Sequence, residues 1–312
     1  MIDFDKAKKL PNKFGGSELK STVLLDNIIY MIKRPDPIKA KSLREAISYK
    51  NNHFSEYLGS NIFSLCGFKT QNVKLGYFTD HNGKRKIVVG CEDFTQDGSK
   101  LYEFAVLVKP YELELGKPKT RIEDIYEVIS KEDFIKNKLE ILDNFWDIFV
   151  IDALIGNSDR HLGNWGVIEK SGKISFAPVY DCGSALGATL DDNTMKKILD
   201  NPILFKANEF NKTSNYTFRN QKIFYHEMFN KPSKALAFAI LRIVPRIDIP
   251  KIHELVNNTP ELSEVRKEYI NKSIDLRFND IIMKAYKKIS KLNNEQVVTP
   301  KKKQTNDDGM KM

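Results

Sequence analysis

Residues 156–164 read Gly156-Asn157-Ser158-Asp159-Arg160-His161-Leu162-Gly163-Asn164, and residues 179–183, beyond a predicted short hairpin, read Val179-Tyr180-Asp181-Cys182-Gly183. The two segments carry the carboxylates of Asp159 and Asp181 and the carboxamide of Asn164. Oxygen donors in small number are the ligands that suit Mg²⁺, which keeps several waters and phosphate oxygens in its shell. Gly156 and Gly163 permit the tight backbone turns that such a loop requires. These segments therefore predict a magnesium site with few protein ligands.

The spacing within this stretch favours phosphoryl transfer. Asp159 and Asn164 have the offset of the base and the metal-binding Asn in a kinase catalytic loop, and the later Asp181-x-Gly183 has the place of the magnesium-binding Asp. Taken singly, Asp159 can be a helix N-cap, Asn164 a turn residue and Asp181 a turn cap. Three matched roles in the right order favour catalysis.

The first ninety residues are predicted to be rich in strands. Residues 21–25 and 28–33 form one hairpin around Asp26-Asn27, and residues 73–78 and 86–91 form another around an Asn-Gly turn. Lys33, at the end of a strand, is placed to reach nucleotide phosphates. A short helix at 43–47 and a longer one at 53–65 are expected between the hairpins. The longer helix has an apolar stripe of Phe54, Leu58, Ile62 and Leu65, with Glu56 off that stripe, where it could pair with Lys33.

The remainder is predicted to be mostly helical. Helical spacing covers residues 122–129, 134–149 and 152–155, and a short strand covers 174–180. A wide apolar face on the second helix is a core face rather than a cofactor site; it consists of Leu139, Leu142, Phe145, Trp146, Phe149 and Val150. One long amphipathic helix is expected over 269–292. Residues 293–312 are polar and lysine-rich, and we expect a disordered tail there.

The order Asp159-Arg160-His161, with Asn164 and Asp181-x-Gly183 after it, resembles the inverted catalytic loop of HipA-like and phosphatidylinositol 3/4-kinase-like kinases. The resemblance spans roughly residues 10 to 290 and implies an α+β, two-lobed, protein-kinase-like fold of the HipA-like type. It divides the chain into a small strand-rich N-lobe at 1–91, a mostly helical C-lobe at 92–292 and a basic tail at 293–312.

The resemblance also implies roles for individual residues, with ATP and Mg²⁺ as cofactors. Asp159 matches the catalytic aspartate, with His161 near the phosphates, and Asn164 and Asp181 match the magnesium ligands. Nucleotide binding is implied for the phosphate-covering loop, the strand lysine with its partner glutamate, and the hinge beside adenine; these residues are Gly15, Gly16, Ser17, Glu18, Leu19, Lys20, Lys33, Glu56, Glu92, Asp93 and Phe94.

Several of these residues also have simpler interpretations. Lys33 can be an edge-strand charge, Glu56 a surface glutamate, Gly15-Gly16 a plain hairpin turn, and His161 a hydrogen-bonded structural residue. The glycine turn lacks the Gly-x-Gly-x-x-Gly spacing of ordinary kinases. Cys182 replaces the Phe of their metal motif, which puts a Phe-in or Phe-out switch in doubt. Autophosphorylation of loop hydroxyls is a weaker hypothesis, for Ser17, Ser21 and Thr22.

Composition limits the partners. The net charge is +9 with a pI of about 9.1, which permits acidic partners, but no zinc-finger or RNA-binding signature accompanies it, so we expect no nucleic-acid partner and at most a peripheral membrane association. No apolar run reaches the roughly 20 residues of a membrane helix. We also expect no DNA binding through a partner antitoxin, because the extension that precedes the kinase in longer HipA proteins is not seen.

Location is predicted from the same features. Three scattered cysteines favour a reducing compartment, and no signal peptide is seen, so the cytoplasm is the default. Some relatives in this group are associated with export and with pro-inflammatory action on host cells, which leaves secretion open. The oligomeric state, the acceptor and the activation trigger are not predicted.

The function predicted from the sequence is an ATP- and Mg²⁺-dependent serine/threonine protein kinase that acts on a protein acceptor. A phosphatidylinositol-type lipid kinase is an alternative, because the Asp-Arg-His order suits it and a basic tail can lie on anionic membrane. A nucleotide-binding pseudokinase or interaction module is another, although the three metal and base residues are intact.

Overall fold

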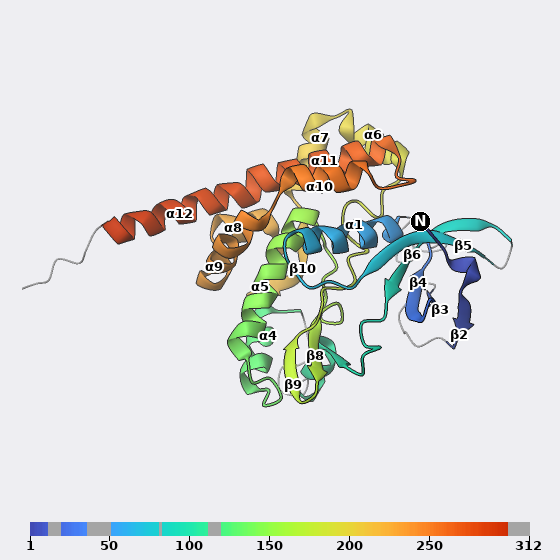
Figure 1. Ribbon diagram of the computed structural model, residues 1–312. Helices are drawn as coiled ribbons and strands as arrows, with labels where there is room; N and C mark the ends of the chain where they lie inside the picture. The colour runs from blue at the N-terminus through green and yellow to red at the C-terminus, as the bar shows by residue number, and fades with distance from the viewer. Residues whose placement is uncertain (12–19, 36–50, 81–82, 112–119, 299–312) are drawn as a thin grey trace, which may run out of the picture.

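The computed structural model describes residues 1–11, 20–35, 51–80, 83–111 and 120–298, and shows a mixed α+β chain (Figure 1). A six-stranded sheet forms one part, and the other part is mostly helical. The expected fold class is therefore confirmed. The sheet ends at Glu92, but a division between 1–91 and 92–292 remains a prediction. Gly15, Gly16, Ser17, Glu18 and Leu19, and the helix predicted at 43–47, lie outside the described residues.

The sheet has the strand order β1-β5-β6-β4-β3-β2. Its strands are β1 (Ile2–Asp3), β2 (Lys8–Leu10), β3 (Lys20–Leu25), β4 (Ile28–Lys33), β5 (Val73–Thr79) and β6 (Arg85–Glu92). β3 and β4 pair in register from Leu25 opposite Ile28 to Lys20 opposite Lys33. Asp26 and Asn27 both have positive φ, which a two-residue hairpin turn of the favoured twist requires. The predicted hairpin is thus confirmed, and its register places Lys33 at the end of the sheet that faces the helical part.

The first ten residues connect the two edges of the sheet. β1 pairs in parallel with β5 at one edge, and β2 pairs antiparallel with β3 at the other. Between them the fully buried Phe4 fills a cluster with Val23, Tyr30, Ile32, Phe78 and Val88. A Cβ at Gly76 or Gly90 would collide with the Phe4 ring, so both positions need glycine. This segment was not predicted from the sequence, since two-residue strands carry almost no periodic signal.

We predict that Phe4→Ala lowers the free energy of unfolding by about 3 kcal/mol, because it leaves a cavity against two glycines that cannot fill it. Urea denaturation followed by tryptophan fluorescence would measure the change. Phe238→Ala is the matched control, because Phe238 is 51% exposed and its loss should cost well under 1 kcal/mol. Equal midpoints for the two variants would contradict the proposed role of Phe4.

Helix α1 (Asn52–Leu65) joins the sheet to the helical part. It contacts β5 and β6 on one side and α10 (Ile249–Asn257) on another. Phe54, Leu58 and Ile62 are buried as predicted, but Leu65 is 41% exposed, because the chain leaves the core at the helix end and turns through Gly67 with φ +83°. Glu56 is fully buried, although it lies off the apolar stripe.

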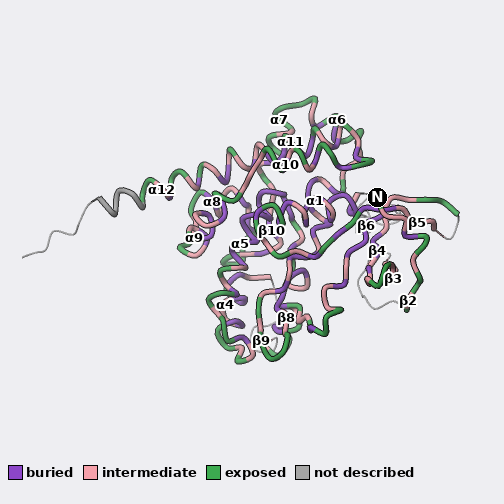
Figure 2. Tube along the Cα trace, in the orientation of Figure 1, coloured by how far each residue is buried: buried purple, intermediate pink, exposed green. Residues whose placement is uncertain are grey.

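The helical part is built around α5 (Lys138–Ile155), which is almost continuously buried after Asp143 (Figure 2). The two predicted helices over 134–149 and 152–155 are one helix in the structure, but it begins only at Lys138, so residues 134–137 are not helical. Phe145, Trp146, Phe149 and Val150 are in the core as expected, but Leu139 is 80% exposed because it lies in the first turn, beyond the packed layer. A small sheet of β7 (Lys100–Glu103), β8 (Gly166–Lys170) and β9 (Lys173–Phe176) packs nearby, with α2 (Phe104–Val108) after β7.

The remaining elements are α4 (Ile122–Lys131), α6 (Asp192–Leu199), α7 (Pro202–Phe210), β10 (Thr213–Phe218), β11 (Gln221–Phe224), α8 (Tyr225–Asn230), α9 (Lys234–Ile243), α11 (Glu264–Arg277) and α12 (Met283–Val298). Of these, α4, α9 and α11 contact α5, while α6 and α7 pack on α11. The helix predicted at 269–292 is two α-helices joined by a π-helical turn, Phe278–Ile282. The backbone stays helical to Val298, past the predicted start of the tail at 293, and residues 299–312 are not described.

Two further findings concern the helices and the cysteines. Within the described ranges, none of the helices combines the length and the apolar character needed to cross a membrane. Cys66, Cys91 and Cys182 are all buried and free.

Candidate active site

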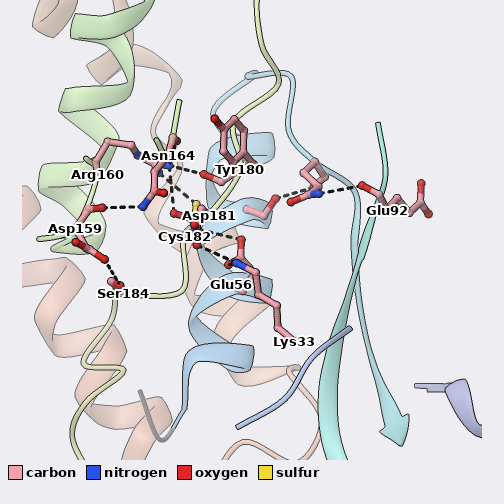
Figure 3. Close-up of polar contacts among 12 residues, drawn as sticks. Lys33, Glu56, Glu92, Asp159, Arg160, Asn164, Tyr180, Asp181, Cys182 and Ser184 are labelled. Atoms are coloured by element: carbon pink, nitrogen blue, oxygen red, sulfur yellow. Dashed lines mark hydrogen bonds and ion pairs between the residues drawn. The ribbon is translucent and has the colours of Figure 1, made fainter. Parts of the chain in front are cut away.

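Five of the predicted site residues come together where the sheet, α1 and the loop after α5 meet (Figure 3). Lys33 comes from the end of β4, Glu56 from α1, Asp159 and Asn164 from the loop between α5 and β8, and Asp181 from the segment after β9. These segments are distant in the chain, so packing alone brings the charged groups together.

An ion-pair chain, buried at Lys33 and Glu56 and one-third exposed at Asp181, links the sheet to the Asp181 segment. The Lys33 ammonium lies 2.6 Å from Glu56 Oε2 and 2.9 Å from Asp181 Oδ1. The other oxygen of Glu56 accepts a 2.9 Å hydrogen bond from the Cys182 amide. The expected pairing of Lys33 with Glu56 is thus present, and Glu56 is not a surface residue. Glu56 orients both the lysine and the backbone beside Asp181.

Asp181 remains ionised in this environment. Burial on its own would raise the pKa of Asp181, but the Lys33 ammonium, with smaller contributions from Lys20 and Arg160, outweighs it and lowers the pKa to about 2. Its backbone has φ +57°, a conformation that non-glycine residues rarely adopt. The surrounding contacts therefore hold an anionic oxygen at this position throughout the neutral pH range.

Asn164 is oriented by its neighbour Asp159. The Asn164 carboxamide nitrogen donates a 2.8 Å hydrogen bond to the Asp159 backbone carbonyl, which leaves the side-chain oxygen Oδ1 as the group that can face a ligand. Asn164 is 7% exposed. With Asp181 it supplies one neutral and one anionic oxygen, a donor set that fits Mg²⁺ bound jointly by protein, water and phosphate.

Sequence reasoning missed the buried Arg160, which ties the two loops together. Its Nε and Nη2 donate to both oxygens of Asp152, at 3.0 and 3.1 Å. Its Nη1 donates to three backbone carbonyls, those of Asn164 at 2.9 Å, Asp181 at 3.2 Å and Tyr180. One guanidinium therefore joins the Asp159–Asn164 loop to the Asp181 segment (Figure 3).

Asp152 and Asn157 support this arrangement. Asp152 is 1% exposed on α5, and its Oδ1 also accepts from the Asn157 side chain at 2.9 Å. Asn157 Oδ1 then accepts from the Asp159 amide at 3.1 Å. The sequence does contain a signal for Asp152, since it is a lone acid within the apolar run Phe149 to Ile155, where an unpaired charge would be costly.

His161 is an exposed residue of the loop that carries Asp159 and Asn164. Its Nδ1 accepts a 3.0 Å hydrogen bond from the Gly163 amide, so Nε2 carries the ring proton and is a donor directed away from that bond. This geometry fits a hydrogen bond to an anionic ligand.

Cys182 occupies a place with no room for a larger side chain. A Cβ at Gly59 of α1 would lie 2.6 Å from Cys182 Cβ, so helix and loop are in close contact there. Burial raises the pKa of the Cys182 thiol to about 12, which makes it an inert packing group. Close contact with α1 explains the absence of a Phe at this position.

The predicted hinge lies at the end of β6. The Glu92 and Asp93 amides already donate to Asn72 and Ile29, each at 2.9 Å. Among the described residues the Phe94 amide has no hydrogen-bond partner, and its ring lies 5.9 Å from that of Tyr180. Of these three predicted residues, Phe94 is therefore the one whose backbone amide is available to donate a hydrogen bond to an adenine ring.

The predicted phosphate-covering loop is represented only by Lys20. This residue begins β3 opposite Lys33 and is close enough to Asp181 to lower its pKa. Gly15, Gly16, Ser17 and Glu18 are outside the described part of the chain.

Comparisons with known proteins give the following matches. The profile of the family described as HipA-like C-terminal domain matches residues 14–236. Serine/threonine-protein kinase CtkA of Helicobacter pylori (strain J99) is 37% identical over 293 residues, which cover 90% of this chain and 86% of that protein.

Two solved structures also resemble the chain. The crystal structure of the Helicobacter pylori proinflammatory kinase CtkA superposes with a TM-score of 0.83 at 35% identity, covering 94% of this chain and 99% of that one. HipA of Shewanella oneidensis MR-1, solved with HipB and operator DNA, gives a TM-score of 0.54 at 12% identity, over 89% of this chain and 70% of that one. The second match concerns the fold alone.

Proposed function

The chain belongs to the HipA-like C-terminal domain family and is a serine/threonine protein kinase, and we propose that it transfers the γ-phosphoryl group of ATP, in the presence of Mg²⁺, to a serine or threonine hydroxyl of a protein. The HipA-like part of the resemblance is confirmed by the family match. These matches give no support to a phosphatidylinositol 3/4-kinase relationship, so we propose a protein acceptor rather than a lipid.

The observation that carries this proposal is the Lys33–Glu56–Asp181 ion-pair chain beside the Arg160-linked loops. Phosphoryl transfer needs positioning and charge stabilisation rather than covalent work by the protein. A buried lysine held between two carboxylates can exchange one of them for nucleotide phosphates while the other keeps it oriented. We assign that orienting role to Glu56, because its other oxygen is bonded to backbone.

We assign the remaining roles as follows. Asn164 Oδ1 and Asp181 would hold Mg²⁺, which when bound neutralises charge on the phosphates. Lys33 and Lys20 would bind phosphates, together with the loop that contains Gly15, Gly16, Ser17 and Glu18, and His161 Nε2 would donate to the γ-phosphate. The Glu92–Phe94 segment would bind adenine.

The transfer itself uses Asp159. The acceptor oxygen forms a bond to the γ-phosphorus as the bond from that phosphorus to the bridging oxygen breaks, and ADP leaves. Asp159 accepts the hydroxyl proton, and the position of its carboxylate fixes where the acceptor oxygen must lie.

We propose two further properties; the second is suggested by likeness to the Helicobacter pylori relative, which is described as a proinflammatory kinase. They are autophosphorylation and action on host cells after export. Phosphate incorporation into the purified protein tests the first, and detection of the protein outside the intact cells that produce it tests the second.

The kinase activity is tested by Asp159→Asn. We predict that kcat falls by about 10²- to 10⁴-fold, because an amide of the same size cannot accept the proton. Transfer of labelled γ-phosphate to a generic basic protein measures it, and circular dichroism controls for folding. A wild-type protein that transfers no phosphate to any acceptor, or a variant that works at the wild-type rate, would show that the proposal is wrong.

A further inference from the structure

Two side chains from distant segments contact the Asp159 carboxylate. Asn215 Nδ2 lies 3.3 Å from Oδ1, and Ser184 Oγ lies 3.3 Å from Oδ2. Figure 3 shows the Ser184 contact. Each carboxylate oxygen thus has its own donor, one a carboxamide and the other a hydroxyl.

Asn215 is held in place by its strand. Residues Ser214 and Tyr216 of β10 are buried while Asn215 is only partly buried, the alternation of a strand with one inner face. Tyr216 packs against Phe145 of α5, with ring centroids 5.3 Å apart. On the other side, the Asn215 carbonyl accepts from Thr120 Oγ1 at 2.8 Å. The carboxamide is therefore presented by a rigid support, as a preorganised site requires.

Ser184 is held from the opposite side. It follows Asp181 by three residues, and the carbonyl of the next residue, Ala185, accepts a 2.8 Å hydrogen bond from Ser55 of α1. Its hydroxyl approaches Asp159 Oδ2 as the hydroxyl of an acceptor would. At 3.3 Å the Ser184 contact is well beyond the usual length of an O–H···O hydrogen bond, whereas the Asn215 contact of the same length is only just beyond the usual N–H···O length and comes from a strand, so Ser184 is the donor that an acceptor displaces more easily.

We infer that Asn215 is a positioning residue that orients the Asp159 carboxylate through Oδ1, and that the acceptor hydroxyl binds at Oδ2, where the Ser184 hydroxyl now lies. This inference rests on the proposed function of Asp159 as the base. If the Asp159 carboxylate rotates away from the acceptor hydroxyl, kcat should fall while the affinity for ATP is unchanged. A small misplacement of a reacting group can lower the rate by about 10²-fold.

The test compares Asn215→Leu, which keeps the shape and removes the donor, with Asn215→His, whose Nδ1 can replace the amide. For Asn215→Leu we expect kcat to fall by about 30- to 100-fold with the KM for ATP unchanged, and for Asn215→His we expect much of this loss to be recovered. Asn211→Leu is the matched control, because Asn211 is exposed and, within the described part of the chain, hydrogen-bonds to Ala207 of its own helix; its kcat should be that of the wild type. Ser184→Ala should lower the KM for the protein acceptor, because a competing hydroxyl is gone.

Three outcomes would overturn the inference: an unchanged kcat in Asn215→Leu, a loss that appears in the KM for ATP, or an equal loss in both Asn215 variants together with lower thermal midpoints. The last of these would indicate a structural role. The wild-type rate is measured first, so an inactive wild type refutes the proposed function and is distinguished from a failure of the Asn215 inference.

Discussion

Arg160→Met is expected to lower the free energy of unfolding by about 3–5 kcal/mol, because it leaves the buried Asp152 carboxylate without its cation. It also removes the donor shared by the carbonyls of Asn164, Tyr180 and Asp181. Such a loss is a large part of the 5–15 kcal/mol that stabilises a typical domain. Urea denaturation monitored by circular dichroism measures it.

The loss of Arg160 should also abolish most of the activity that remains in folded protein. Without the guanidinium, the Asp159–Asn164 loop and the Asp181 segment are no longer tied to each other, and we expect kcat to fall by more than about 10²-fold. Arg160→Lys keeps the positive charge, but lysine has three hydrogen-bond donors in place of the five on the planar guanidinium. The kcat of Arg160→Lys should therefore lie between those of the wild type and Arg160→Met.

Arg121→Met is the matched control for this experiment. Arg121 also forms a two-point contact with an aspartate, Asp124 at 2.9 and 2.5 Å, but its side chain is 30% exposed. Its loss should cost about 1 kcal/mol or less, because water can replace the lost bonds. If Arg160→Met were no less stable than Arg121→Met, the assignment of Arg160 as the link between the loops would be wrong.

The second large effect is expected for Asp181→Asn, with a fall in kcat of about 10³-fold or more. The substitution keeps the size of the side chain and removes the anionic oxygen that we assign to Mg²⁺, and electrostatic groups are the main source of rate in phosphoryl transfer. Lys33 keeps its 2.6 Å contact with Glu56, so the fold should persist. Steady-state kinetics at several Mg²⁺ concentrations would show a raised metal requirement as well as the lower kcat.

Asp200→Asn controls for the removal of one negative charge. Asp200 pairs with Lys196 at 3.4 Å, and both side chains are about two-thirds exposed, so neither activity nor stability should change measurably. Normal turnover by Asp181→Asn at low Mg²⁺ would rule out the metal-binding role.

The pH of the assay does not complicate this comparison. Because the pKa of Asp181 is lowered to about 2, its ion pair with Lys33 contributes stability above pH 4, and this contribution is lost as the pH falls through about 2. Assays near neutral pH therefore compare a fully ionised Asp181 in the wild type with a neutral side chain in the variant.

Short stretches of sequence were enough to predict several turns and helices of this protein and the order of its candidate site residues. The Asp26-Asn27 turn, the helix from residue 53 and the order of Asp159, Asn164 and Asp181 could all be read from short windows. Turn chemistry and apolar periodicity act between residues a few positions apart, so they are visible without knowledge of the fold. Two predictions were wrong because the local pattern does not decide them. Leu139 has the spacing of a core residue but is exposed, and the apolar period of the helix predicted at 269–292 does not reveal the π-helical turn at Phe278–Ile282.

Tertiary structure alone decided which polar side chains meet. The chain has 50 lysines and arginines, and nothing local distinguishes the buried Arg160 from the many exposed ones. Lys33 and Asp181 are 148 residues apart, and Asn215 is 56 residues from Asp159. Such pairs form because the packing of α1, α5 and β10 removes water from a shared space, where a charge or a donor must find a partner in another segment.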